Sequence, residues 1–157
     1  MDVSEVDRLF MAEALKEAKR ALEHRDVPVG AVVVRGGEIL GRGHNRREVD
    51  GDPLAHAEIL ALRQASRKIS GWRLEECALY VTLEPCAMCA GALVNSRIPL
   101  LIFGARDPKA GFGGSVGNLI RHPKLNHRLE VREGVLASAC SDLLKHFFRD
   151  LRQQRKR

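Results

Sequence analysis

Two short segments carry the side chains whose types and spacing could do chemistry. The segment "PLAHAEIL" places His56 two residues before Glu58, and "TLEPCAMCAGAL" places Cys86 three residues before Cys89. A C-x-x-C pair at a helix start could be a redox dithiol, half of a structural zinc site, or two ligands of a catalytic zinc ion. In each case the N–H groups at the helix start favour the thiolate form of cysteine.

Counting candidate ligands favours the catalytic zinc site. A structural zinc ion needs four protein ligands, usually from paired motifs, and the sequence has no second C-x-x-C and no H-x-x-x-H pair. A catalytic zinc ion uses three protein ligands and leaves one position for water, which His56, Cys86 and Cys89 satisfy. The redox alternative leaves His56 and Glu58 without a role. The other candidate ligands follow no pattern, and we expect buried cysteines or surface histidines: Cys77, Cys140, His44, His122 and His127.

Glu58 is the candidate proton carrier of such a site. On its own, the pair of His56 and Glu58 favours an ordinary interpretation, in which a hydrogen-bonded histidine and a solvated acid lie near a helix start. Residues two apart do not share a helix face, so both can serve one site only across the open N-terminal end of the helix. The H-E-x-x-H arrangement of zinc proteases is excluded by the spacing.

The first third of the sequence predicts a helix and a β-hairpin. Ser4 and Asp7 resemble a capping box, and apolar residues then recur at helical spacing until the helix ends near His24. The segments "VGAVVV" and "EILGRGHN" flank Gly36 and Gly37, which can adopt the positive φ values of a tight turn. They therefore predict two antiparallel strands.

The next elements would position the candidate ligands. Asp52 is the predicted N-cap and Pro53 the first residue of a helix that runs to about Lys68, with His56 and Glu58 in its first turn. The apolar run "ALYVTLE" predicts a buried strand, and Pro85 then marks the start of a helix that contains both cysteines of the pair. Strand and helix thus meet at the cysteines.

The remaining elements predict an α/β fold. "LLIFGA" is typical of a buried strand, "RLEV" of an edge strand, and residues 136–157 of a long basic terminal helix. A hairpin followed by alternating helices and strands indicates a mixed sheet covered by helices. At 157 residues and 45% hydrophobic content, we expect residues 1–157 to form a single domain.

Composition indicates a polyanionic partner and a cytoplasmic location. The formal net charge is +6, and the last nine residues, "RDLRQQRKR", hold five basic residues and one acid. The N-terminus "MDVSEVDRLF" lacks the basic flank and apolar run of a secretory signal, and no apolar stretch is long enough to cross a membrane. Four cysteines form no dense disulfide framework, which favours metal or catalytic use.

The two chemical segments together resemble a known signature. "HAE" followed by "PCAMC" is similar to the H-x-E and P-C-x-x-C signature of zinc nucleobase deaminases, which act on several different bases. Five segments resemble, more narrowly, the tRNA-specific adenosine deaminases: "VPVGAVVV", "GHNRRE", "DPLAHAEILALRQ", "LYVTLEPCAMCAGALVNSRI" and "FGARDPKAG". The likeness covers most of Val27 to Leu136 and is weaker in the N-terminal helix and in "GFGGSVGNLI".

The resemblance implies a reaction and a fold. The reaction is hydrolytic deamination of adenosine to inosine at the wobble position of a tRNA anticodon loop, with one Zn²⁺ per chain and Glu58 as proton shuttle for a zinc-activated water. The fold is a three-layer α/β/α sandwich of the cytidine deaminase type, with a central mixed sheet of about five strands. The resemblance also implies a homodimer whose two subunits both contact the RNA stem-loop.

Further site residues follow from the resemblance alone. Asn45 matches an asparagine that hydrogen-bonds the flipped base, Ala57 and Glu84 contribute main chain to its pocket, and Asp107 matches an acid near the neighbouring ribose. Each has an ordinary alternative, because Asn45 could close a strand end and Asp107 could be a turn residue.

The terminal helix supplies the last candidates. Phe147 and Phe148 precede Arg149 and Arg152, so an aromatic pair able to stack on a base leads into cations suited to phosphates. Core packing and a solvated basic end are the alternatives. For the whole chain, the rival functions are a deaminase of free guanine or cytosine and a non-catalytic zinc-binding RNA module. Glu58 argues against the second, because a structural site needs no acid beside an open metal position.

Overall fold

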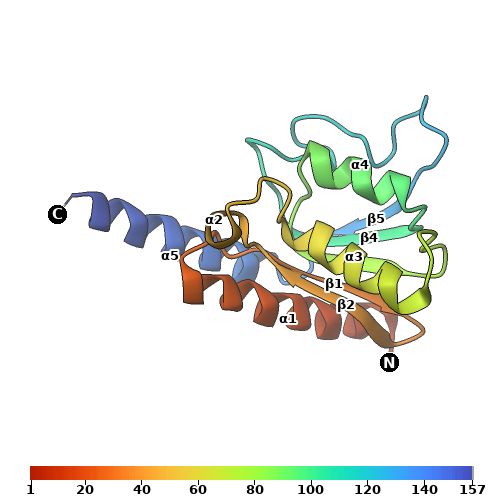
Figure 1. The fold of residues 1–157 in the computed structure, drawn as a ribbon, viewed down its shortest axis with the longest axis horizontal. Coiled ribbons are helices and arrows are strands. Elements are labelled where there is room, and N and C mark those ends of the chain that lie inside the picture. Colours follow the sequence, from red (N-terminus) through yellow and green to blue (C-terminus); the bar gives the residue numbers. More distant parts are fainter. Residues whose placement is uncertain (157) are drawn as a thin grey trace.

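Five strands and five α-helices are present in the computed structural model, which describes residues 1–156 (Figure 1). The strands are β1 (Gly30–Arg35), β2 (Glu38–His44), β3 (Ala78–Leu83), β4 (Leu100–Ala105) and β5 (Glu130–Glu133). The helices are α1 (Val3–Ala21), α2 (Arg47–Asp50), α3 (Ala57–Ile69), α4 (Ala87–Asn95) and α5 (Ala137–Arg155). A short 3-10 helix, η1 (Leu22–His24), extends α1.

The strands form one mixed sheet in the order β2-β1-β3-β4-β5. β1 is antiparallel to β2 and β3, whereas β3, β4 and β5 are parallel. Gly36 and Gly37 have φ values of 56° and 79°, which confirms the predicted tight turn between β1 and β2. Parallel neighbours need a crossover, which α4 provides between β3 and β4. The carboxyl ends of these two strands therefore meet at one edge of the sheet, the usual place for a ligand in α/β proteins.

Helices cover both faces of the sheet, which confirms the three-layer α/β/α arrangement (Figure 1). α3 and α4 pack on one face through a core that includes Ala61, Leu79 and Leu93. α1 and the start of α5 pack on the other face, around Met11 and Tyr80. Burial of apolar side chains on both faces fixes the sheet and α3, and with them the end of β3 before Cys86 and the start of α3 at His56.

The predicted capping box of the first helix is wrong. The N-cap of α1 is Asp2, whose Oδ1 accepts a hydrogen bond from the Glu5 N–H at 2.8 Å. Ser4 Oγ instead accepts from Arg8, and Asp7 is buried, where it accepts from Tyr80 Oη at 2.7 Å. An aspartate two residues earlier satisfies the exposed N–H groups equally well.

The predicted start of the ligand-bearing helix is also wrong. α3 begins at Ala57, with His56 as N-cap, and not at Pro53. Asp52 Oδ1 accepts from the Leu54 N–H at 2.9 Å, so it caps a local turn and not the helix. His56 therefore lies just before the helix and Glu58 is its second residue.

The terminal helix, α5, runs from Ala137 to Arg155, within the expected range of 136–157, and Arg157 lies outside the described residues. In α5 only Cys140 is buried, and Figure 1 shows the last turns projecting from the body. Within residues 1–156 no helix combines the length and apolar character that spanning a bilayer requires.

Candidate active site

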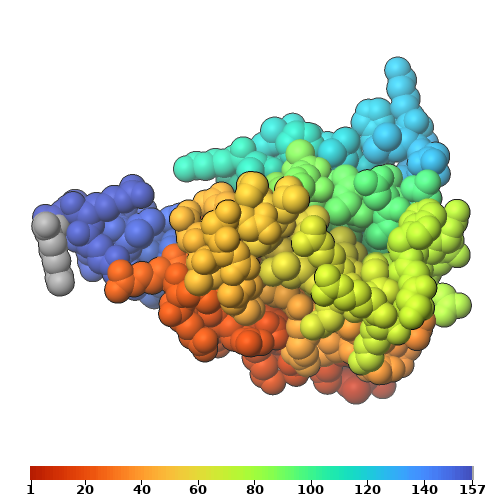
Figure 2. Space-filling model, viewed as in Figure 1, coloured from red at the N-terminus to blue at the C-terminus, as the bar shows by residue number. Residues whose placement is uncertain are grey.

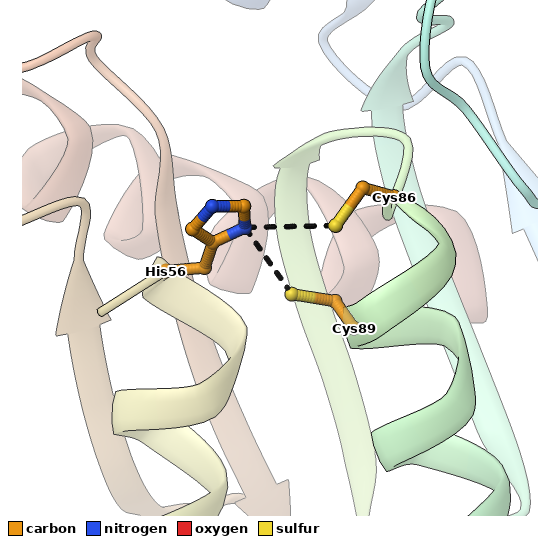
Figure 3. Close-up of side chains that lie close together, drawn as sticks. All are labelled: His56, Cys86 and Cys89. Atoms are coloured by element: carbon orange, nitrogen blue, oxygen red, sulfur yellow. Dashed lines mark hydrogen bonds between the residues drawn. The ribbon is translucent and has the colours of Figure 1, made fainter. Parts of the chain in front are cut away.

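Three candidate ligands converge between the N-terminal ends of α3 and α4 (Figure 3). His56 Nδ1 lies 3.6 Å from Cys86 Sγ and 3.5 Å from Cys89 Sγ. All three ligand atoms lie within 4.8 Å of one another. Cys86 is the N-cap of α4 and Cys89 lies in the first turn of this helix. Both cysteines are therefore positioned by the connection between β3 and α4.

The donor set fits a tetrahedral zinc ion. Zinc bonds of about 2.3 Å to sulfur and about 2.0 Å to nitrogen, at a tetrahedral angle, place S and N about 3.5 Å apart. The two distances from His56 Nδ1 agree with this value. Two thiolates and one imidazole are also ligands that zinc prefers.

The group offers three candidate ligands, one fewer than a tetrahedral zinc ion accepts. Among residues 1–156, no fourth histidine, cysteine or acid joins the group. Cys77 and Cys140 are free and buried elsewhere, and His44 lies 3.4 Å from Glu17 Oε2. A set of three ligands is typical of catalytic zinc and not of structural zinc.

Contact between the two thiols shifts their pKa values in opposite directions. A hydrogen bond from Cys89, with a second contribution from His56, lowers the pKa of Cys86 to about 3. The same contact with Cys86, together with burial, raises the pKa of Cys89. The hydrogen bond to Cys86 also raises the pKa of His56. The contacts at Cys86 therefore favour its thiolate, the form that binds metal.

Glu58 lies beside the ligands in a dry environment. Its side chain is 4% exposed, and burial raises its pKa to about 7, with a smaller contribution from the Cys86 charge. A carboxyl group with a pKa near neutrality can both accept and return a proton. A bound divalent cation would favour the carboxylate.

A cavity of about 210 Å³ opens onto the ligands. The predicted residues Asn45, Ala57, Glu58, Glu84 and Asp107 line it, together with His56 and Cys86. The structure thus brings together, around one cavity, residues that follow β2, β3 and β4 and residues at the start of α3.

Asn45 and Asp107 also make the local bonds that ordinary turn residues make. Asn45 Nδ2 donates to Val27 O at 3.1 Å, which leaves its second hydrogen for a ligand. Asp107 Oδ1 accepts from the N–H groups of Lys109 and Ala110, at 3.1 and 3.2 Å. Both side chains are therefore held in place at the cavity wall.

The Glu84 side chain makes contacts that sequence reasoning missed. It is 2% exposed and accepts hydrogen bonds from Asp107, Gly113 and Ser115. Burial raises the pKa of Glu84, but these donors outweigh burial and hold the pKa below its usual range. The glycines of "GFGGSVGNLI" were the sequence signal for these contacts, because a backbone segment that packs tightly against another group often requires glycine.

A wider groove of about 860 Å³ adjoins the cavity, and Figure 2 shows the hollow between α5 and the teal segment above it. The two hollows share Val27, Leu83, Asp107 and Ala110. Five cations line the groove: Arg106, Lys109, Lys145, Arg149 and Arg152.

Only part of the predicted aromatic pair reaches this groove. Phe148 lines it and is 41% exposed, whereas Phe147 does not line it. The two rings meet edge to face at 5.3 Å, and neither belongs to the buried core clusters. Core packing is therefore excluded for Phe148, and a binding role remains a prediction.

Comparison with known proteins decides the family. The family model of MafB19-like deaminases matches residues 5–152. The chain is 51% identical over 150 residues to the tRNA-specific adenosine deaminase of Bacillus subtilis (strain 168), covering 96% of this chain and 93% of that protein. The chain belongs to the tRNA-specific adenosine deaminase family. The relative of the same name from Aquifex aeolicus (strain VF5) is 51% identical over 143 residues, covering 91% of this chain and 94% of that protein.

Solved structures of other deaminases share the fold of this chain. A structure from a study of A-to-I editing by tRNA:A34 deaminases has a TM-score of 0.83 at 41% identity, covering 86% of this chain and 98% of that chain. The guanine deaminase of Nitrosomonas europaea has a TM-score of 0.78 at 27% identity, covering 89% and 83%. The fold is therefore shared by deaminases of different bases, and the substrate must be argued from the site.

Proposed function

We propose that this deaminase converts adenosine to inosine at the wobble position of a tRNA anticodon loop. The observation that carries the proposal is the small cavity beside the group of candidate metal ligands, which adjoins a cation-lined groove. Family membership supports the reaction, because relatives at 51% identity are named tRNA-specific adenosine deaminases.

The shape of the site suits one base of a longer polymer. Pockets for drug-sized ligands span about 300–1,000 Å³, and the cavity of about 210 Å³ is smaller, which suits a single flat heterocycle. The groove of about 860 Å³ has room for flanking nucleotides, and its cations suit their phosphates. An unpaired loop base enters such a cavity at less cost than a base in a duplex.

His56 Nδ1, Cys86 Sγ and Cys89 Sγ would hold one zinc ion, as the distances between these atoms support. When bound, zinc would supply a Lewis acid that lowers the pKa of a water molecule to about 7. The protein contributes ligands on two helix starts and a carboxyl group excluded from bulk water.

Glu58 would move the protons of the reaction. It takes a proton from water and delivers one to adenine N1, as the water oxygen bonds to C6. It then helps to protonate the amino nitrogen, which leaves as ammonia when its bond to C6 breaks. Adenosine and water thus give inosine and ammonia. Asn45 would hold the base through its free amide hydrogen, with Ala57 and Glu84 contributing main chain and Asp107 facing the neighbouring ribose.

The terminal helix would bind the RNA backbone. Arg149 and Arg152 lie on the groove wall beside the exposed ring of Phe148. Cations bind phosphates, and an exposed ring can stack on a base. Phe147 would support Phe148 through their edge contact.

A homodimer in the cytoplasm completes the proposal. The face of α3 and α4 has a hollow of about 590 Å³ beside Trp72, which is 56% exposed. An exposed aromatic side chain beside a hollow is typical of protein contact surfaces. Light scattering on the purified protein checks the expectation of twice the chain mass, and a monomer at every concentration would contradict it.

The test of function is direct. The zinc-loaded protein is incubated with a synthetic anticodon stem-loop that carries adenosine at the wobble position, and inosine is measured by mass spectrometry. Free adenosine, cytidine and guanine, and a stem-loop with guanosine at that position, are the comparison substrates. We expect inosine in the first stem-loop and poor turnover of the others. Efficient deamination of free guanine without inosine in RNA would contradict the proposal and favour the activity of the structural relative.

A further inference from the structure

Glu84, the residue after β3, carries a buried carboxylate whose side chain the proposed chemistry does not use. Its hydrogen-bond donors all belong to the segment from Asp107 to Ser115. They are the N–H groups of Asp107 at 3.0 Å, Gly113 at 2.9 Å and Ser115 at 3.0 Å, and the Ser115 hydroxyl. A carboxylate with several charge-assisted hydrogen bonds holds its donors in a fixed arrangement.

The segment is shaped around this carboxylate. A Cβ atom at Gly111 would lie 2.3 Å from Glu84 Cδ and 2.6 Å from Asp107 O, so no other residue fits there without movement. A Cβ atom at Gly113 would lie 3.3 Å from Glu84 Cγ, which is also tight. The glycines therefore allow the chain to fold closely over the acid.

Residues 84–86 include both Glu84 and a candidate metal ligand, Cys86. The Glu84 N–H donates to Ala105 O at 2.8 Å, and the Phe112 N–H donates to Pro85 O at 2.8 Å. Pro85 directly precedes Cys86. Residues 84–86 thus connect the segment on one side to the metal-ligand group on the other.

The segment forms a shared wall of the two hollows. Asp107 and Ala110 line both the cavity of about 210 Å³ and the groove of about 860 Å³. A displacement of the segment would therefore change the entrance through which a base and its neighbour are bound.

We infer that Glu84 is a positioning residue that fixes the segment Asp107–Ser115 as the substrate-binding wall. The inference rests on the proposed function. Glu84 acts through Asp107 and not on the reacting atoms, so its loss weakens binding of the stem-loop and leaves chemistry on bound substrate nearly unchanged. A merely structural role would lower stability without this separation of KM from kcat.

Glu84→Gln is the informative variant. It replaces one carboxylate oxygen, which accepts hydrogen bonds, by an amide nitrogen, which donates them, so N–H groups of the segment lose their acceptor. We expect KM for the stem-loop to rise by about 10- to 100-fold and kcat to change by less than about threefold. Zinc content should stay at the wild-type value. Asp7→Asn is the matched control, since it also alters a buried, hydrogen-bonded acid but lies on the α1 side of the sheet. It should lower stability without raising KM.

A double-mutant cycle tests whether Glu84 acts through Asp107. The increases in KM caused by Glu84→Gln and Asp107→Ala should combine to much less than their product, because both remove one wall. The increases in KM caused by Glu84→Gln and Asn45→Ala should combine to their product, because Asn45 follows β2 and lies outside the segment Asp107–Ser115. Multiplicative effects for Glu84 and Asp107, or a fall in kcat at unchanged KM, would overturn the inference.

Amide hydrogen exchange gives a readout independent of activity. In the zinc-loaded wild type, the N–H groups of Asp107, Gly113 and Ser115 should be protected, and in Glu84→Gln they should exchange faster. Equal protection in both would overturn the inference even if the RNA is a substrate. Absence of inosine with the wild type would instead contradict the proposed function, with the exchange result still standing. If Glu84→Gln does not fold, Ser115→Ala replaces it, with an expected smaller increase in KM of about two- to fivefold.

Discussion

Replacement of Glu58 by glutamine tests the proposed proton shuttle. Glutamine keeps the size of the side chain and removes only the ability to exchange a proton. Glu58 is 4% exposed and is not one of the three candidate metal ligands. We therefore expect the variant to fold, to bind zinc like the wild type and to lose turnover.

The expected loss of turnover is large because no other carboxyl group on the cavity wall can replace Glu58. The other carboxyl groups on the cavity wall are those of Glu84 and Asp107. Glu84 accepts hydrogen bonds from the segment after β4, and Asp107 Oδ1 caps the turn at Lys109 and Ala110. Neither is placed to replace Glu58. General acid–base catalysis contributes about 10²–10⁴-fold, and because Glu58 serves more than one proton transfer, we expect kcat to fall by about 10⁴-fold, or about 5.5 kcal/mol.

The assay is single-turnover formation of inosine at saturating stem-loop, with zinc measured by mass spectrometry and RNA affinity measured separately. Glu75→Gln is the control, because Glu75 is an exposed acid paired with Arg73. It should keep kcat within about twofold of the wild type. A kcat for Glu58→Gln within about tenfold of the wild type would remove Glu58 from the mechanism. Zinc loss in proportion to activity would also refute the reasoning.

Three further predictions concern the metal, the RNA and the fold. Cys86→Ala should lose most of its zinc, because two ligands remain, and undiminished zinc in metal analysis would contradict the assigned site. Arg149→Gln combined with Arg152→Gln should reduce the slope of log affinity against log salt by up to about 1.4, whereas an unchanged slope would mean a solvated helix end. Burial and the hydrogen bond to Asp7 raise the pKa of Tyr80, so its stabilising contribution is present below about pH 10 and lost as pH rises further. Tyr80 is the only tyrosine, so tyrosinate absorbance measures its ionisation, and a midpoint near pH 10 in the folded protein would contradict the prediction.

The elements that sequence predicted well are those whose signal is local. The apolar run from Leu100 to Ala105 forms β4 with the expected bounds, and the glycine pair forms the expected turn. The grouping of His56, Cys86 and Cys89, which could hold a metal ion, was also predictable from the spacing and type of these residues. Helix starts were less predictable because several polar residues near each start could act as the cap.

The wall of the cavity could not be predicted, because its contacts join residues far apart in the chain. Glu84 and Ser115 are 31 residues apart, and no local pattern marks the hydrogen bonds between them. Similarly, Asp7 and Arg132 form an ion pair across 125 residues at 2.8 Å. Such pairs depend on the sheet order β1-β3-β4-β5, which the sequence leaves open.

Glu58 and Glu84 show how one site uses two buried acids differently. Both are at most 4% exposed, yet the pKa of Glu58 is raised to about 7 and that of Glu84 is lowered. Burial raises the pKa in both cases, so the difference comes from their partners. The donors from Asp107 to Ser115 keep Glu84 ionised, and an acid that stays ionised cannot carry protons but can hold a segment in place. Among residues 1–156 no comparable set of donors surrounds Glu58, so burial leaves its pKa raised and favours the uptake of a proton, as a shuttle requires.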